Sequence, residues 1–317
     1  MTDRPYVLHV TALTASVDSV SGVGPRVSAH VALTKPRIIE LLLVTAIPTM
    51  MLAAQGLPSG RVAVAVIVGG MLAAGGANTL NSVYDRDIDS LMRRTSHRPA
   101  PLGLITTTAG VVQGLVLTLL SAAVLWWLAN PLSAMLAILA VLMYAVGYTM
   151  ILKRRTPQNI VWGGAAGCMP VLIAWSATTN SLSWIPVNLF MIIFFWTPPH
   201  YWPLAMKYRD DYANAGIPML PVVKTNAVVV RSITRYAWAM VATTLLLAPV
   251  ASMGWVYTVV AVALGAAFLA LAYGLRGGVG HEESVDQVNR RALKLFHGSI
   301  TYLSVLFLAI ALSPFVP

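Results

Sequence analysis

Charge is scarce in this chain. Asp, Glu, Lys and Arg make up 10% of its 317 residues, against about 25% in soluble domains, and hydrophobic residues make up 57%. So little charge cannot cover a surface exposed to water, which excludes an ordinary soluble protein and indicates lipid as the main solvent. Cysteine is scarcer still. The single residue, Cys168, excludes a disulfide within the chain and is interpreted as a small buried apolar side chain.

The apolar residues gather in nine runs of about 17–25 residues, the helix length that crosses ~30 Å of hydrocarbon. Only helices and closed barrels satisfy all their backbone hydrogen bonds in lipid, and continuous rather than alternating runs indicate helices. The predicted fold class is an all-α polytopic membrane protein with nine transmembrane helices. The predicted spans are Ile38–Ala54, Val62–Leu80, Thr106–Leu128, Ser133–Ile151, Ile160–Ala177, Trp184–Met206, Ile233–Ser252, Val256–Leu275 and Phe296–Leu312.

The basic residues predict the orientation. When the loops are numbered alternately, one set holds only Arg61 and the other set holds the remaining 20 of the 21 Lys and Arg residues. The positive-inside rule then places the N-terminus in the cytoplasm and the C-terminus outside, in an integral protein of the cell membrane.

The N-terminal tail and the net positive charge give no sign of a specific macromolecular partner. Residues 1–33 lack a sustained apolar run and are predicted to form a loosely ordered cytoplasmic tail, with residues 34–317 as the transmembrane domain. The net charge of +10 follows largely from the topology and gives no reason to expect nucleic acid as a partner. Basic loops favour anionic ligands or the headgroups of the lipid bilayer.

The strongest local signal is a stripe of oxygen-bearing side chains after the second predicted helix. Asn81, Asp85 and Asp89 are spaced four residues apart, so they share one face if the helix continues. Magnesium favours such a site because it takes one or two carboxylates and fills its remaining positions with water and phosphate oxygens. The alternative is a helix end whose acids merely pair with neighbouring arginines. The metal interpretation places the active site at the cytoplasmic face.

Cations follow this stripe, and a second acidic loop lies four helices later. Arg94 and Arg98 have guanidinium groups suited to bidentate phosphate contact, although ordinary positive-inside charge would also explain them. Asp210 and Asp211 follow the sixth predicted helix on the same side of the membrane. An even number of helices separates the two loops, which is compatible with a parallel internal repeat whose acid loops face each other across a shared cavity. Glu40 is the one acid within a predicted span and is a further site candidate.

Several longer strings carry a family resemblance. Asn-x-x-x-Asp-x-x-x-Asp followed by Arg-Thr-x-x-Arg-Pro resembles the UbiA superfamily of intramembrane prenyltransferases, and within it the branch that farnesylates haem. The resemblance covers residues 34–312. Its strings are Thr34–Arg37, Tyr84–Asp89, Leu152–Ile160, Trp196–Trp202, Asp210–Val223 and Phe296–Leu303.

The resemblance implies a reaction and its reactants. A member of this branch would transfer the farnesyl group of farnesyl diphosphate to a vinyl group of haem B, with Mg²⁺ as cofactor, and would give haem O. The product would serve a terminal oxidase assembly pathway, with haem A synthase as a candidate partner. Two alternatives stay open from the residues: a prenyltransferase for an aromatic or quinone precursor, and an ion-coupled transporter. The transporter is the weaker of these because the charges lie at one surface and not near the midplane.

The resemblance also assigns roles in the first half of the site. Asn81, Asp85 and Asp89 would hold the first Mg²⁺, and Arg94 with Arg98 would bind diphosphate. Two basic residues that follow the fourth helix, Lys153 and Arg154, would contact the diphosphate from the opposite side.

Two aromatic-ring residues carry weaker assignments. Tyr148 could face the allylic cation through a cation–π contact, or it could be a packing tyrosine. His200 could ligate haem iron or contact a propionate, or it could make an ordinary hydrogen bond where Pro198 and Pro199 are predicted to interrupt the helix.

The second acidic loop departs from the family pattern. Many members of the superfamily carry a second Asp-x-x-x-Asp for a second Mg²⁺; here Asp211 matches its last acid, but the position four residues earlier is Lys207. Either Asp210 and Asp211 hold the second ion together while Lys207 contacts diphosphate, or one Mg²⁺ and Lys207 suffice. We favour the first arrangement, with Asp211 in a catalytic role.

Overall fold

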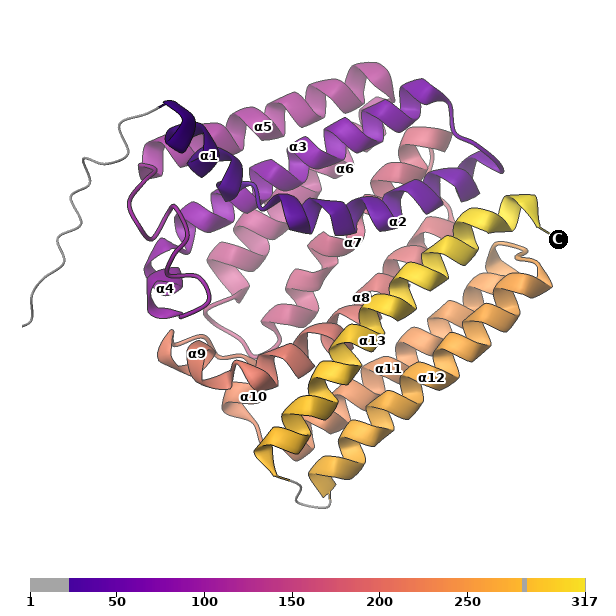
Figure 1. The fold of residues 1–317 in the computed structure, drawn as a ribbon. Coiled ribbons are helices and arrows are strands. Elements are labelled where there is room, and N and C mark those ends of the chain that lie inside the picture. Colours follow the sequence, from indigo (N-terminus) through magenta and orange to yellow (C-terminus); the bar gives the residue numbers. More distant parts are fainter. Residues whose placement is uncertain (1–22, 281–283, 317) are drawn as a thin grey trace, which may run out of the picture.

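The computed structural model describes residues 23–280 and 284–316, and within these ranges the chain forms helices and no strand. Long helices lie side by side in one bundle (Figure 1). Their bounds are α2 Pro36–Ala54, α3 Gly60–Tyr84, α5 Thr107–Leu128, α6 Pro131–Leu142 continued by the π-helix η2 Met143–Leu152, α7 Asn159–Thr179, α8 Trp184–Lys207, α11 Asn226–Val250, α12 Trp255–Gly280 and α13 Val285–Leu312. The short helices are α1 Val23–Leu33, α4 Arg86–Leu91, α9 Arg209–Asn214, α10 Leu220–Val223 and η3 Ser313–Phe315.

Each predicted apolar run coincides with one long helix, but fewer helices qualify as membrane spans. Among the described residues, seven are long and apolar enough to cross a membrane. The two others are α2, whose described apolar part is Leu42–Ala54, and α8, which carries three prolines and the polar residues Asn188 and His200. The prediction of an all-helical membrane protein is confirmed, whereas nine spans are not confirmed by helix composition.

Helix ends differ from the prediction where polar turns continue an apolar helix. Helix α13 begins at Val285, well before the predicted Phe296, because Ser284 and Gln287 form a capping box at its start. Helix α11 likewise begins at Asn226 and not at Ile233. These added turns extend the two helices beyond the apolar runs.

The predicted break in α8 is wrong. Pro198, Pro199 and Pro203 all lie inside one continuous helix. Prolines remove backbone donors, but neighbouring helices and Thr side chains can compensate inside a membrane bundle. Helix α8 is flanked by α7, α11 and α13.

The predicted tail is also more ordered than expected near its end. Residues 1–22 lie outside the described part, but Val23–Leu33 form α1. Leu33 is buried, and the His30 ring nitrogen Nδ1 lies 2.5 Å from the Gln113 side-chain oxygen of α5. Helix α1 therefore packs on the bundle before the chain turns at Lys35 into α2. The side chain of Glu40, a predicted site candidate, lies outside the described side chains.

The two halves of the bundle use the same neighbour order. Helices α2, α3, α5 and α6 pack successively, as do α7, α8, α11 and α12, and α13 contacts α2, α8 and α12. This order is compatible with the predicted repeat. The cores differ in character: the second half has an extensive cluster that includes Trp202, Tyr257 and Phe268, whereas the first half packs around alanines and a few larger residues. Cys168 is fully buried, as predicted.

Glycines bring α3 and α5 into close contact. A Cβ atom on Gly76 would lie 2.8 Å from the backbone oxygen of Gly114 and 2.7 Å from the Thr118 hydroxyl. Ser121 donates its hydroxyl to the Gly69 carbonyl at 2.7 Å across the same interface. Without a hydrophobic force between helices in lipid, such close approach supplies much of the packing energy. It also fixes the helix whose end carries the acid stripe.

We predict that Gly76→Ala destabilises the protein by about 1–3 kcal/mol, because its methyl group would overlap backbone atoms that cannot move independently. Gly70 lies on the same helix with open space around its Cβ position, so Gly70→Ala is the matched control. Thermal unfolding in detergent should show a lower melting temperature for the first variant alone. Equal melting temperatures would contradict the close-packing interpretation.

Candidate active site

The predicted stripe keeps its alignment through a change of helix. Helix α3 ends at Tyr84, and Asp85 joins it to α4. The helical bonding pattern continues across the junction, because the Asp85 amide donates to the Asn81 carbonyl at 2.9 Å and the Asp89 amide donates to the Asp85 carbonyl at 2.8 Å. Asn81, Asp85 and Asp89 are all buried, so the three side chains line one face as expected.

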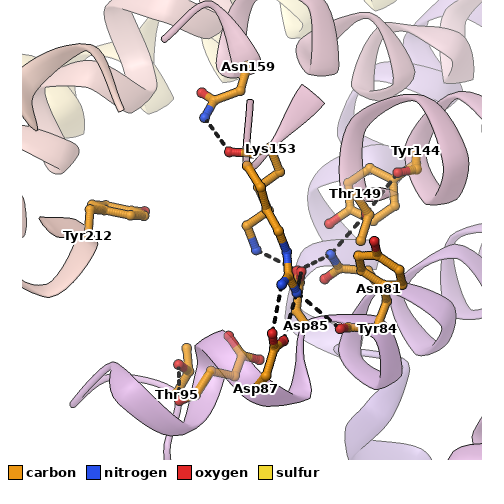
Figure 2. Close-up of polar contacts among 12 residues, drawn as sticks. Asn81, Tyr84, Asp85, Asp87, Thr95, Tyr144, Thr149, Lys153, Asn159 and Tyr212 are labelled. Carbon is orange, nitrogen blue, oxygen red and sulfur yellow. Dashed lines mark hydrogen bonds and ion pairs between the residues drawn. The ribbon is translucent and has the colours of Figure 1, made fainter. Parts of the chain in front are cut away.

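Two lysines from distant segments contact the stripe. Lys35, between α1 and α2, donates to the Asn81 side-chain oxygen at 2.6 Å. Lys153, just after η2, lies 2.5 Å from Asp85 Oδ2 and points toward it in Figure 2. The side-chain amide of Asn81 in turn donates to Thr149 Oγ1 at 3.0 Å. The stripe therefore joins three segments far apart in the sequence.

The third member of the stripe is paired within its own loop. Arg98 lies 2.9 Å from Asp89 Oδ2, and Thr95 donates its hydroxyl to the Asp89 carbonyl at 2.9 Å. The two acids thus do pair with cations, and Lys153, the partner of Asp85, comes from outside this loop. Arg86, Arg93 and Arg94 are not their partners.

Lys35 is in an unusual setting. Its backbone adopts a left-handed conformation, with φ of 54°, immediately before Pro36. Desolvation by burial lowers the pKa of its ammonium group to about 7, and the positive charges of Arg98 and Lys153 act in the same direction. Strained backbone conformations of this kind concentrate at functional sites. Lys35 was not predicted as a site residue, because its contact with Asn81 spans 46 residues.

Arg154 faces a different acid. Its guanidinium group makes two hydrogen bonds of 2.7 Å to Asp87 and lies 5.1 Å from the centroid of the Tyr84 ring. These hydrogen bonds lower the pKa of the Asp87 carboxyl group and raise that of Arg154. Arg154 also approaches Asp85 Oδ1 at 3.7 Å. Arg154 therefore lies at the edge of the stripe, with a longer ion pair to Asp85 than that of Lys153.

One carboxylate oxygen of the stripe accepts no hydrogen bond from the part of the chain that the structure describes. Asp85 Oδ1 is buried and has no hydrogen-bond partner among the described residues. The described residues contain no group of three or more His, Cys, Asp or Glu side chains that could hold a metal alone. The donors present fit magnesium, which takes one or two carboxylates and relies on water and phosphate for the rest.

A π-helix sets the position of Lys153. In η2 each amide bonds five residues back, and the Lys153 amide donates to the Tyr148 carbonyl at 2.8 Å. Thr149 and Lys153 are four residues apart, and they meet Asn81 and Asp85, which are also four apart (Figure 2). π-Helical turns are rare and frequent at functional sites. No feature of the sequence predicted this one.

Tyr148 is a packing residue in this structure. Its ring stacks on Tyr144 with centroids 5.6 Å apart, and it lies against Gly163 of α7. A Cβ atom at Gly163 would come within 2.1 Å of the Tyr148 ring. The cation–π role therefore stays a prediction.

The second acidic loop lies at the same end of the bundle as the stripe (Figure 1). Arg94 contacts the Tyr212 hydroxyl at 3.4 Å and lies 5.6 Å from the Tyr208 ring centroid. Ile88 of α4 and Met92 of the following turn share a buried cluster with residues after α9, namely Ala215, Ile217 and Met219. The two loops therefore contact each other, whereas a cavity shared between their acids stays a prediction.

The acids of this second loop are less enclosed than the stripe. Asp210 is exposed on α9 and Asp211 is half-buried. Lys207 ends α8, and its ammonium nitrogen lies 5.6 Å from the centroid of the Tyr208 ring. Both arrangements, the one with a second Mg²⁺ and the one with Lys207 in its place, stay predictions.

His200 is held by neighbours inside the protein. Its Nδ1 lies 2.7 Å from the Ser299 hydroxyl, and its ring stacks with Trp196 and Phe296 at centroid distances of 4.1 and 4.7 Å. Trp196 also donates to the Ser299 carbonyl at 2.8 Å, which joins α8 to α13. The hydrogen bond exists without a helix break. A role toward haem iron or a propionate stays a prediction.

Comparison with known proteins agrees with this geometry. The model of the UbiA prenyltransferase family matches residues 42–285. A protein of Streptomyces coelicolor named protoheme IX farnesyltransferase is 55% identical over 293 residues, which cover 92% of each chain. Among the relatives compared, others at 50% identity or more bear the same name.

Solved structures share the fold at low identity. A digeranylgeranylglyceryl phosphate synthase superposes with a TM-score of 0.74 at 15% identity, covering 91% of this chain and 98% of that one. A UbiA homolog from Archaeoglobus fulgidus bound to GPP and Mg²⁺ gives a TM-score of 0.61 at 16% identity, covering 89% and 99%. Since the family model matches most of the chain and the relatives span nearly all of it, this chain belongs to the UbiA prenyltransferase family.

Proposed function

We propose that this enzyme transfers the farnesyl group of farnesyl diphosphate to a vinyl group of haem B, releases diphosphate and yields haem O for terminal oxidase cofactor biosynthesis. The names of its relatives support the choice of haem as acceptor. Haem A synthase would be the next enzyme to act on the product. The observation that carries the proposal is the buried stripe at the end of α3, where each member contacts a cation and one oxygen of Asp85 remains free.

The charges of this cluster suit a diphosphate with one divalent cation. Lys35, Lys153 and Arg98 supply three positive charges and Asp85 with Asp89 two negative ones, which leaves +1 when Lys35 is protonated. One Mg²⁺ raises the total to +3. A prenyl diphosphate carries about three negative charges at neutral pH, so the loaded site would be nearly neutral. Near neutrality reduces the cost of keeping so many charges away from water.

Asn81, Asp85 and Asp89 would hold the ion, with the free Oδ1 of Asp85 as its first protein ligand. When bound, Mg²⁺ supplies positive charge to the oxygen that leaves carbon C1 of the farnesyl chain. Lys153, which pairs with Asp85, would also supply positive charge to the diphosphate. Arg94 and Arg98 would stabilise the same developing negative charge from the side of α4.

The reaction then needs no protein nucleophile. Cleavage of the C1–O bond leaves an allylic cation, and the terminal vinyl carbon of haem B forms the new C–C bond. The positive charge moves to the vinyl carbon attached to the porphyrin, where water adds and loses a proton to give the hydroxyethylfarnesyl group. The stacked rings of Tyr144 and Tyr148, on the helix that leads to Lys153, would border the cation. Burial of the stripe limits early capture of the cation by water.

We further propose nine membrane spans with the N-terminus inside and the C-terminus outside, with the parallel repeat described above. Helices α2 and α8 would cross with the other seven, since a helix surrounded by others meets little lipid and tolerates polar residues. Much of α8 is buried inside the bundle. The opposite ends of the bundle also carry unequal charge, with Arg61 alone among the basic residues on the predicted outer side.

This topology predicts that a C-terminal alkaline phosphatase fusion is active, because that enzyme folds only outside the cytoplasm. A C-terminal green fluorescent protein fusion should be dark when exported by the same route. Fusions ending in the loop after α6/η2, near Arg155, serve as the matched control and should give the reverse pattern. Fluorescence from the C-terminal fusion would remove one span from the proposal.

The proposed reaction is tested by supplying haem B, farnesyl diphosphate and Mg²⁺ to membranes that contain the enzyme, with haem O detected by mass spectrometry. We predict that Asp85→Asn lowers the rate by roughly 10²–10³-fold, because it weakens binding of the ion whose positive charge stabilises the leaving diphosphate. Asp87→Asn is the matched control, since Asp87 is exposed and bonds Arg154 at the edge of the site. A normal rate for Asp85→Asn, with both variants inserted equally, would refute the metal assignment.

The second acidic loop gives a separate prediction. If Asp210 and Asp211 hold a second Mg²⁺, Asp211→Asn should lower activity by tenfold or more, roughly the loss of one charge-assisted contact, and raise the Mg²⁺ concentration needed for half-maximal rate. If Lys207 replaces that ion, Lys207→Ala should be the severe variant and Asp211→Asn mild at saturating Mg²⁺. We expect the first pattern. A severe Asp211→Asn defect with unchanged Mg²⁺ dependence would instead indicate a structural contact of the loop.

A further inference from the structure

An apolar groove runs along the outer face of the first half of the bundle. It encloses a cavity of about 550 Å³ between α3, α5 and the α6/η2 helix, which are neighbours in the fold (Figure 1). Its wall is formed by aliphatic side chains of all three helices, including Leu80, Val83, Val111, Leu115, Leu142 and Val146. Leu115, Leu142 and Val146 are exposed, at 52%, 51% and 40%. In a membrane bundle this face meets lipid.

A polar pocket adjoins the groove at the end of the bundle that carries α4. Its lining includes Arg86, Asp87, Ser90 and Arg154, and Tyr84 lines both the pocket and the groove. The guanidinium group of Arg86 lies against the loop before α5, where its Nη2 is 3.4 Å from the Cβ position of Gly103. The polar pocket, with its two guanidinium groups, and the apolar groove therefore meet at Tyr84.

This arrangement adjoins the active site at Arg154, whose Nη2 also approaches Asp85 Oδ1 at 3.7 Å. Tyr84 is 41% exposed, whereas the next residue, Asp85, is 1% exposed and turns its side chain into the bundle. Leu80 and Val83 line the groove, while Asn81 between them belongs to the stripe. One face of α3 thus lines the apolar groove and another carries the stripe, and Arg154 lies between the two.

The charge of the pocket indicates what kind of headgroup it fits. Arg86 and Arg154 supply two positive charges and Asp87 one negative charge, so the lining has a net charge of +1. Asp87 already holds two donors of Arg154, which leaves Arg86 as the main unneutralised charge. A single positive charge matches a phosphodiester, which carries one negative charge. It matches poorly a prenyl diphosphate, which carries about three.

We propose that the pocket and groove together bind one anionic phospholipid. Its phosphodiester lies between the guanidinium groups of Arg86 and Arg154, and the Tyr84 ring borders its glycerol region. One acyl chain fills the groove between α3, α5 and α6/η2. An anionic lipid is favoured over a zwitterionic one because Arg86 meets no opposing headgroup charge with the former. The bound lipid would support α3 from the side opposite the active site.

Native mass spectrometry of the purified protein tests this proposal. The protein is released from detergent after incubation with equal amounts of phosphatidylglycerol and phosphatidylcholine of the same chain length. We expect a retained phosphatidylglycerol adduct and about fivefold weaker binding in Arg86→Gln, the effect of losing one basic residue near a lipid surface. Arg155→Gln is the matched control, because Arg155 is exposed one residue from Arg154 and does not line the pocket.

A second pair of variants tests the groove. Val146→Trp should fill the channel and reduce the adduct by a similar factor, whereas Ile151→Trp, on an exposed position of the same helix outside the groove, should not. Circular dichroism and gel filtration establish that each variant is folded. Equal retention of both lipids, equal loss in Arg86→Gln and Arg155→Gln, or unchanged adducts in Val146→Trp would each overturn the proposal. Displacement of the adduct by equimolar farnesyl thiolodiphosphate would also overturn it and assign the groove to the prenyl substrate.

Discussion

The contact between Lys153 and Asp85 is the constraint on which the rest of the site depends. It joins the end of α3 to the end of η2, two segments 68 residues apart, and both groups are largely buried. A buried carboxylate without a partner would be strongly unfavourable, so this pair specifies how the second and fourth long helices meet. The contact between Asn81 and Thr149 repeats the register one turn deeper in the bundle. Together the two contacts hold the stripe in place before any substrate binds.

The same contacts explain why the free carboxylate oxygen is informative. Lys153 uses one oxygen of Asp85, and Arg154 comes no closer than 3.7 Å to the other. The protein thus neutralises the acid without using all its acceptor capacity. Such a site tolerates the absence of ligand and still offers a position to an incoming cation. A site in which every oxygen accepted a strong hydrogen bond would have to break one before binding anything.

Local periodicity predicted the parts of this structure that depend on local sequence. The apolar runs identified each long helix, and the four-residue spacing correctly placed Asn81, Asp85 and Asp89 on one face. Spacing could not identify Lys35 or Lys153 as partners of the stripe, because both reach it only through tertiary packing. The family resemblance placed Lys153 in the site, whereas Lys35 was not predicted there. The same holds for α8, whose prolines would end an isolated helix but are accommodated by surrounding helices.

The distance in sequence between Asp85 and Lys153 bears on how the protein is made. At a synthesis rate of about 5–20 residues per second, Lys153 leaves the ribosome roughly 3–14 seconds after Asp85, since 68 residues separate them. During that interval the carboxylate lacks Lys153, although Asn81 of the same helix can donate a hydrogen bond to it. Because Asp85 lies at the end of α3 and not in its middle, its carboxylate can stay in the aqueous headgroup region at low free-energy cost. The arrival of the fourth long helix then buries the acid and completes the first half of the bundle while the remaining helices are still being translated.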